Sequence, residues 1–223
     1  MTLQEIRNFI RQQLREDFSQ AFSDLVLNNL INNAYKELAR VGLFLRKTAT
    51  VTVDTSGVVA LPQNFIAPPL VVRFNNLPLS RESFRTLDVY LPNWRTLTGS
   101  QPTYWVFQPP FSIVVVPKPS TGTWTLEIDG FWTPDASDTT FPLLTNDTDT
   151  PKMPEAYHIA LAYKAIMELA AMAPEDQLLQ QRAAYYSSLY TNILQELMNR
   201  YRQQIDTRGM DLPIIAAPTE RGR

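Results

Sequence analysis

The spacing of apolar residues changes twice along this chain of 223 residues, and these changes limit its possible folds. In residues 3–14 and 24–42 apolar side chains recur every three or four positions, which predicts two helices. In residues 47–131 they alternate instead, in short runs separated by turn-forming residues, which predicts antiparallel strands. From residue 154 to about 206 the helical spacing returns. We therefore expect an α+β fold in which helices at both ends enclose a β region.

Residues near the predicted helix ends support these assignments. Thr2 and Glu5 fit a capping box, and Ser23 can cap the second helix. Gly42 stands where many helices end in a left-handed residue, so we expect Gly42 to adopt that conformation. A proline followed by two acids at residues 174–176 opens the last helix, where negative charge is favourable.

Turn-forming residues divide the β region into pairs of strands. Residues 47–54 and 58–61 flank a Thr-Ser-Gly turn, so they predict a first hairpin. Residues 70–74 and 77–80 flank two asparagines and predict a second hairpin, after which residues 83–91 fit a short helix. The strands are short and the prolines lie between them, which is typical of antiparallel sheets.

The last hairpin of the β region contains its most apolar strand. Residues 104–108 and 113–116 flank two prolines, and the strand 113–116 is apolar on both faces, so we expect both faces to be covered. A single domain of this size has a limited capacity to bury that strand together with four tryptophans. We therefore expect copies of the chain to associate. The expected subunit contacts are Trp105, Val114 and Trp124.

The changes of spacing predict a division of the chain into four segments. Residues 1–46 and 151–206 form the two halves of a helical bundle, and residues 47–150 form an antiparallel β-domain inserted between them. Residues 207–223 have no helical spacing and contain two prolines, so we expect them to form an extended tail.

Composition excludes several classes of function. The chain has no cysteine and one histidine, so disulfides, thiol nucleophiles and metal sites rich in cysteine or histidine are excluded. Glycine-rich phosphate-binding motifs are absent from the sequence. A net charge of −2 argues against a protein that coats nucleic acid. No stretch reaches the roughly 18 apolar residues of a membrane helix. We expect a protein that is made in the cytosol. We also expect no enzymatic activity and no cofactor.

Two polar features could suggest chemistry, but simpler interpretations fit both. His158 lies in the first turns of a helix, and the sequence provides neither a nucleophile nor an orienting partner, so we favour a structural or surface histidine. Asp135, Asp138, Asp147 and Asp149 lie in a loop that lacks the glycine of a calcium site. We expect a solvated acidic loop, which would matter electrostatically if many copies surrounded one axis.

Five stretches follow one another in an order that is more specific than any of them alone. They are the helix LINNAYKELA at 30–39, the strand VALPQNF at 59–65, FNNLPL at 74–79 leading to YLPNW at 90–94, GSQPTYW at 99–105 with the two strands that follow it, and the helix pair at 154–201. In this order the chain resembles the head-to-tail adaptor, or connector, proteins of tailed bacteriophages over roughly residues 20–205.

The resemblance implies a structural role in the virion neck, with assembly in the host cytoplasm. Similar proteins form a ring, usually of twelve copies, beneath the portal of a DNA-filled head. They extend the DNA channel, offer a surface to the tail or the next neck protein, and have no active site. The implied partners are the portal protein, the tail or neck protein, further copies of the chain, and double-stranded DNA that passes without specific binding.

The C-terminal segment of similar adaptors reaches up to the portal. The segment here is more apolar than a solubilising tail requires, and a short extended segment can bind by joining a sheet edge or by filling a groove. We expect apolar anchors and terminal arginines that meet acidic groups. These residues are Leu212, Ile214, Ile215, Arg221 and Arg223.

Two other classes of function stay open at this point. An enzyme that uses scattered carboxylates would need paired acids on converging elements, whereas most acids here fall in loops or on polar helix faces. A sugar-binding or structural β module of a tail fibre would explain the four tryptophans but not the helix pairs at both ends. The mass in solution separates both from a ring, because the alternatives predict monomers or trimers.

Overall fold

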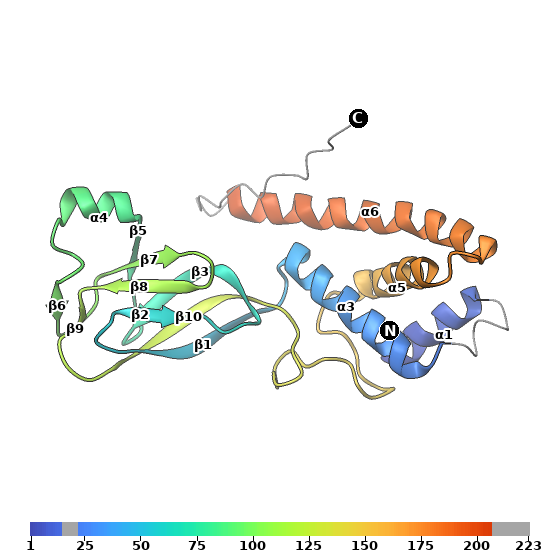
Figure 1. Cartoon of the computed structure of the whole chain (residues 1–223), viewed down its shortest axis with the longest axis horizontal. Helices are drawn as coiled ribbons and strands as arrows, with labels where there is room; N and C mark the ends of the chain where they lie inside the picture. The colour runs from blue at the N-terminus through green and yellow to red at the C-terminus, as the bar shows by residue number, and fades with distance from the viewer. Residues whose placement is uncertain (15–21, 207–223) are drawn as a thin grey trace.

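The computed structural model describes residues 1–14 and 22–206. Figure 1 shows an elongated molecule with a group of helices (the bundle) at one end and the strands, together with helix α4 (the β region), at the other. The fold is α+β, with helices from both ends of the chain flanking the β region, as the sequence predicted. The division into segments at 46/47, 150/151 and 206/207 stays a prediction.

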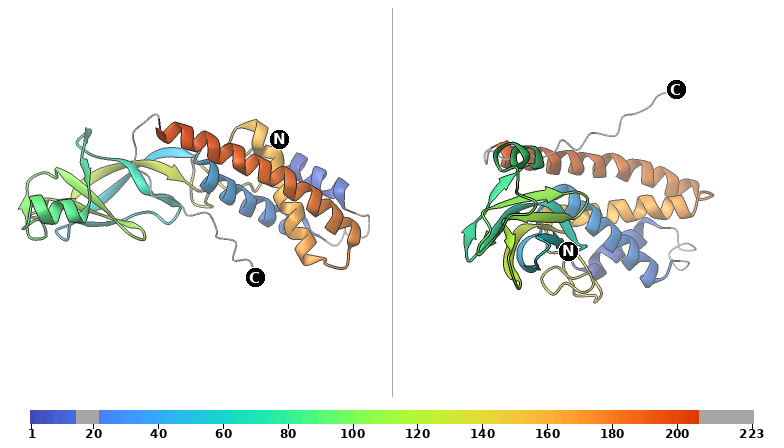
Figure 2. Two further views of the ribbon diagram at one scale, coloured as in Figure 1. Left: turned by 90° about the horizontal axis from the view of Figure 1, so that it is seen from above. Right: turned by 60° about the vertical axis from the view of Figure 1, so that its left-hand side comes forward.

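Helix α5 lies at the centre of the bundle. None of its residues from His158 to Ala170 is exposed, because α1, α3 and α6 all pack against it. Figure 2 shows α6 on one side of α5, and α1 with α3 on the other. The helices are α1 (Leu3–Gln13), α3 (Asp24–Gly42), α5 (His158–Met172), which follows a 3-10 turn at Glu155–Tyr157, and α6 (Gln177–Asp206).

The predicted caps of the first two helices are confirmed, but the predicted end of α3 is wrong. Thr2 forms a capping box with Glu5, and the Ser23 hydroxyl accepts from the N–H of Val26. Gly42 is the last helical residue, and the left-handed residue is Leu43, with φ of 46°. A glycine suits position 42 for another reason, since a Cβ atom there would collide with the Phe44 ring.

The strands form two four-stranded sheets that face each other. The first sheet has the order β1-β10-β3-β4 and the second has the order β2-β8-β7-β5. All neighbours are antiparallel except β5 with β7, and the separate pair of β6 with β9 is also parallel. The strands are β1 (Arg46–Val53), β2 (Val58–Ala60), β3 (Phe65–Phe74), β4 (Leu77–Pro78), β5 (Ser80–Glu82), β6 (Thr98–Gly99), β7 (Tyr104–Gln108), β8 (Ser112–Val116), β9 (Lys118–Pro119) and β10 (Trp124–Trp132).

Two of the three predicted hairpins are confirmed. β3 pairs with β4 around Asn75 and Asn76, which both have positive φ, and β7 pairs with β8. The predicted hairpin of β1 with β2 is wrong, because the chain passes from the first sheet to the second at this turn. β2 is three residues long, whereas β10 offers β1 a partner over eight residue pairs. The longer ladder satisfies more backbone groups.

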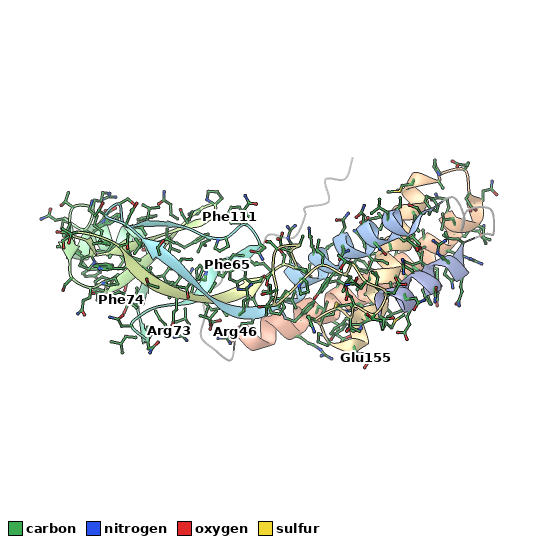
Figure 3. The ribbon with its side chains drawn as sticks, turned by 90° about the horizontal axis from the view of Figure 1, so that it is seen from below. Arg46, Phe65, Arg73, Phe74, Phe111 and Glu155 are labelled. Carbon is green, nitrogen blue, oxygen red and sulfur yellow. The ribbon has the colours of Figure 1, made fainter. Side chains whose placement is uncertain are left out.

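The predicted short helix is also present, as α4 (Phe84–Tyr90). It lies at the end of the molecule that is farthest from the bundle (Figure 1). Figure 3 shows Phe74 and Arg73 toward that distal end, and Arg46 and Phe65 near the junction with the bundle. The β region therefore has a proximal end that joins the bundle and a distal end that carries α4.

Candidate assembly surfaces

Strand β8 is covered on both faces within one copy of the chain. All four residues from Ile113 to Val116 are buried, and they alternate between the core shared by the two sheets and a second core beneath α4. The prediction that both faces are covered is confirmed. The residues that cover its second face belong to the same chain. The need to bury this strand therefore gives no reason for copies to associate.

The three residues predicted as subunit contacts lie in three different surroundings. Trp105 is 1% exposed inside the core of the two sheets, and a side chain buried so deeply has no surface to offer another copy. Val114 packs in the core beneath α4. Trp124 is half-buried, with its ring centroid 5.5 Å from that of Phe74. A subunit contact at Trp124 stays a prediction.

The tryptophans do not form an open platform of the kind that stacks on sugars. Trp94, Trp105 and Trp132 are buried. Trp94 stacks on Phe84 with ring centroids 5.6 Å apart, and the Arg95 guanidinium lies over its ring at 4.3 Å. The aromatic rings that suggested a sugar-binding module therefore serve the interior of the β region.

The distal end of the β region exposes apolar side chains. Tyr90 of α4 is 81% exposed, and Val89 beside it is also exposed. Next to α4, Trp94 and Arg95 line a shallow hollow of about 400 Å³. Hydrogen bonds from Arg95 and then from the Trp94 indole hold the pKa of Asp88 below its usual value, which keeps this carboxylate charged. This surface could accept a protein partner at the end opposite the bundle.

The acidic loop is not simply solvated, and the expectation is wrong for Asp138. Its side chain is 3% exposed and pairs with the Lys47 ammonium of β1. It also accepts from the Asn64 side chain at 3.1 Å and from the N–H groups of Thr140 and Phe141 at 2.9 and 3.2 Å. Burial raises the pKa of Asp138, but the hydrogen bonds from Lys47 and from the two backbone N–H groups outweigh burial and lower it.

The segment that connects β10 to the 3-10 turn, residues 133–154, is fastened to the bundle as well. Arg7 of α1 forms ion pairs with Asp147 of this connecting segment and with Asp24, the latter at 3.0 Å. The N–H of Leu3 donates to the carbonyl of Asp149 at 2.8 Å. Because Asp138 and Lys47 join the same segment to the β region, it links the two parts of the molecule.

His158 is a structural histidine, in agreement with the interpretation favoured from the sequence. Its Nδ1 lies 2.9 Å from the Met1 amine, and its Nε2 lies 2.9 Å from the carbonyl oxygen of Met153. Within residues 1–14 and 22–206, no three histidine or acidic side chains are grouped so that they could hold a metal ion. No helix in the same residues is long and apolar enough to cross a membrane.

One surface of the bundle was not predicted from the sequence. The exposed face of α6 carries no charged side chain from Gln177 to Gln195, and its sequence signal is the absence of any charged residue from 183 to 195. We call this face the α6 stripe. It consists of Gln177, Gln181, Ala184, Tyr185, Ser188, Thr191, Asn192, Gln195, Met198 and Asn199.

A comparison with family models gives a match that covers residues 1–214, and the family is described as SU10 adaptor protein. The chain belongs to the SU10 adaptor protein family. This membership agrees with the resemblance to phage head-to-tail adaptors, and it makes the chain a structural phage adaptor rather than a member of an enzyme family. An adaptor of this kind belongs in the virion neck, between portal and tail components. A comparison with curated proteins gave no match.

The residues predicted to bind the portal in this SU10-family adaptor lie outside the described residues. Leu212 and Ile214 fall within the stretch that matches the family, whereas Ile215, Arg221 and Arg223 follow it. Their role therefore stays a prediction.

Proposed function

We propose that the protein is the head-to-tail adaptor that docks beneath the portal, extends the DNA channel and connects the head to the tail. The observation that carries the proposal is the family match, which spans residues 1–214 of the chain. The elongated shape supports it, since the bundle and α4 lie at opposite ends (Figure 1) and one copy can contact two different partners.

The adaptor acts as a closed ring of twelve copies that forms on the portal in the host cytoplasm. A ring needs two different surfaces on each copy, because head-to-tail contacts close around an axis whereas a self-complementary contact stops at a dimer. Trp124 supplies part of such a surface in the β region. The free protein is monomeric until the portal gathers the copies.

The C-terminal tail docks on the portal, with Ile214 and Ile215 as apolar anchors. Leu212 supports them, and Arg221 and Arg223 meet acidic groups of the portal. Each tail binds weakly, but a ring that is held at several points multiplies weak contacts through effective concentration. The simpler possibility is a tail without a role, and deletion of the tail separates the two.

The channel is passive toward DNA. Duplex must slide through it, and many bound phosphates would hold the duplex in place. The net charge of −2 favours a lumen without a basic excess. The acidic loop contributes less free charge than its sequence suggested, since Asp138 and Asp147 are paired with Lys47 and Arg7.

The experiment mixes the full chain with the portal protein of the same phage and images the complex by electron microscopy. The expected result is a complete ring beneath each portal. A portal that carries only one or two copies would contradict the proposed ring. A second sample ends at Asp206. It should keep the helical circular-dichroism signal and fail to join the portal, whereas complete rings from this truncated chain would show that the tail has no docking role.

A further inference from the structure

Strand β1 is a long, open edge of the first sheet. Its eight residues pair with β10 on one side, and no described strand pairs with its other side. Figure 1 shows β1 along the lower side of the β region. The other edges suit an added strand less well. β2 and β5 have three residues each, β4 has two, and the part of β3 that extends past β4 contains Pro68 and Pro69, which have no N–H to donate.

The hydrogen bonds of β1 show which of its residues direct their backbone groups outward. The N–H of Trp132 donates to the carbonyl of Leu45 at 2.8 Å, and the bonded pairs of an antiparallel ladder alternate. The odd-numbered residues of 47–53 therefore bond to β10. The backbone groups of the three threonines between them point away from β10 and are free to pair with another strand. These residues are Thr48, Thr50 and Thr52.

The sequence of β1 lacks the features that usually protect a sheet edge. Prolines, charged side chains and bulges keep natural edges from pairing. From Thr48 to Val53 the strand contains only threonine, alanine and valine, and its register with β10 is regular. Ala49 and Val51 are only partly buried at the border of the core between the two sheets. An added strand would therefore gain backbone hydrogen bonds and cover apolar side chains.

Opposite charges at the two ends of the strand indicate which strand is added. The Arg46 side chain is 44% exposed at one end, and the exposed Asp54 follows the other end. Hydrogen bonds from the hydroxyl and the N–H of Ser56 lower the pKa of Asp54, which keeps this carboxylate charged. In an antiparallel pair of two β1 strands centred on Thr50, Arg46 of each copy lies opposite Asp54 of the other. Opposite charges that face each other across strands stabilise the pair.

The ion pair that Arg46 forms within its own chain is compatible with this arrangement. Its Nε and Nη2 donate to the two carboxylate oxygens of Asp129. Among the described residues its Nη1 has no acceptor, so a second carboxylate can approach there. A parallel pair of β1 strands would instead place Arg46 opposite Arg46, which is unfavourable.

We propose that two copies of the chain pair through their β1 edges, antiparallel and centred on Thr50. The threonines then exchange backbone hydrogen bonds, and two sheets of four strands join into one sheet of eight. Ala49 of each copy lies opposite Val51 of the other, over the border of the core. A shift of the pairing by two residues would separate Arg46 from Asp54, and a shift by one would turn the apolar residues to the wrong face.

This dimer goes beyond the proposed ring and lies outside it, because a self-complementary contact cannot continue around the portal axis. Eight residues form an edge about 27 Å long, which with a sheet thickness of about 10 Å covers roughly 270 Å² on each copy. A standard stable interface buries about 800 Å² on each partner. The dimer is therefore weak. Dilute copies stay monomeric, whereas concentrated free copies pair and so protect an edge that would otherwise aggregate.

Single cysteines test the register, because the chain has no cysteine of its own. Thr50→Cys places two sulfur atoms near the two-fold axis, on Cα atoms about 5.5 Å apart, which suits a disulfide. The concentrated full chain should give covalent dimers under mild oxidation. In the matched control, Thr48→Cys, the two cysteines lie four residues apart along the pair, about 14 Å, and should not join. No dimers from Thr50→Cys, or equal amounts from Thr48→Cys, would overturn the proposal.

Sedimentation equilibrium of the full chain provides a second, independent measurement. Thr50→Pro removes an outward N–H but no hydrogen bond to β10, so the variant should keep its circular-dichroism signal. The dissociation constant of the dimer should rise about tenfold, because one hydrogen bond is lost from each copy. Thr50→Val keeps the N–H and should pair as the original chain does. A monomeric mass at every concentration, or equal constants for Thr50→Pro and the original chain, would contradict the inference.

Both measurements use the free chain, so their results are separate from the proposed function. If the edge instead accepts a strand of the portal or tail, the free chain stays monomeric at every concentration, and the proposed dimer is wrong. If that monomeric chain still forms complete rings on the portal, the proposed function stands.

Discussion

Asn32 of α3 pairs with the backbone of Leu144 through two buried hydrogen bonds. The Nδ2 of Asn32 donates to the Leu144 carbonyl at 2.9 Å, and the Leu144 N–H donates to the Asn32 Oδ1 at 2.8 Å. The side chain thus satisfies both backbone polar groups of Leu144, which lies in a segment without regular structure. Because Leu144 also belongs to the bundle core, this pair fixes the middle of the connecting segment to the bundle.

Replacing Asn32 by alanine should lower the free energy of unfolding by about 2–4 kcal/mol. The variant leaves the N–H and the carbonyl of Leu144 buried without partners, and each unsatisfied group costs about 1–3 kcal/mol. Urea denaturation measures the change. Asn33→Ala, at the exposed neighbouring position, is the matched control and should change stability by no more than about 0.5 kcal/mol. Equal effects of the two variants would contradict the role of this pair.

From the ion pair of Lys47 and Asp138 we predict how the free energy of unfolding changes at acidic pH. The folded pKa of Asp138 is depressed, so its contribution is fully present above the unfolded pKa of about 3.9 and is lost as pH falls through the folded pKa. Asp138→Asn should therefore lower stability at pH 7 by about 2 kcal/mol, since hydrogen bonds to a charged group are lost. The difference between variant and original chain should shrink below pH 4.

Urea denaturation at pH 7, 4.5 and 3 tests this dependence. Glu175→Gln, at an exposed position before α6, serves as the control for removing one acidic side chain. A loss of stability in Asp138→Asn that stays constant from pH 7 to pH 3 would show that the carboxylate charge is not the source of the effect.

Much of the fold could be predicted from the sequence because its signals are local. Helical spacing and the caps at Thr2 and Ser23 act within a few residues, and so does the pair Asn75-Asn76 that turns β3 into β4. The partner of β1 is β10, more than seventy residues later in the chain. The alternation of apolar residues within a short strand does not indicate which other strand pairs with it. The false hairpin of β1 with β2 came from this lack of long-range information.

The candidate sites were harder to predict for the same reason. The acids of the connecting segment suggested a solvated loop because residues 132–151 contain no basic residue. Two of these acids, Asp147 and Asp138, pair with Arg7 of α1 and Lys47 of β1. Trp105 suggested a contact surface, whereas it fills the core of its own chain. The α6 stripe does have a local signal, because thirteen successive residues without a charge, 183–195, fall within a stretch of helical spacing.

From the buried Tyr35 we predict that the free energy of unfolding decreases at alkaline pH. Its side chain is fully buried, its hydroxyl accepts from the Lys152 N–H at 2.8 Å, and burial raises its pKa to about 12. The unfolded tyrosine titrates near pH 10, so this contribution is fully present below pH 10 and is lost as pH rises toward 12. A shift of two units corresponds to about 2.7 kcal/mol.

The variant Tyr35→Phe tests this dependence. It should be less stable at pH 7 by about 1 kcal/mol, because the Lys152 N–H loses its partner. It should also lose less stability than the original chain between pH 9 and pH 11. Tyr90→Phe, at a residue that is 81% exposed, is the control for one fewer tyrosine. Parallel stability curves for the original chain and Tyr35→Phe in base would contradict the prediction.

The end of α3 provides a prediction that is tested by the sign of the change in the free energy of unfolding. Leu43 has φ of 46°, and the left-handed conformation costs an ordinary residue about 1 kcal/mol, whereas glycine adopts it freely. Leu43 belongs to none of the three apolar cores of the described residues, so little packing is lost with its side chain. Leu43→Gly should therefore raise the free energy of unfolding by about 0.5 kcal/mol, since the greater freedom of glycine in the unfolded chain offsets part of the gain.

The neighbouring variant Gly42→Ala should do the opposite. A Cβ atom at residue 42 meets the ring of Phe44, and such overpacking costs about 1–3 kcal/mol. Combining Gly42→Ala with Phe44→Leu should recover part of this loss, because the smaller side chain leaves room for the methyl group. Thermal unfolding of all three variants distinguishes a helix end with Leu43 in the left-handed conformation from one with Gly42 in it. If Gly42 were the left-handed residue, Leu43→Gly would destabilise the protein, and Phe44→Leu would not relieve the effect of Gly42→Ala.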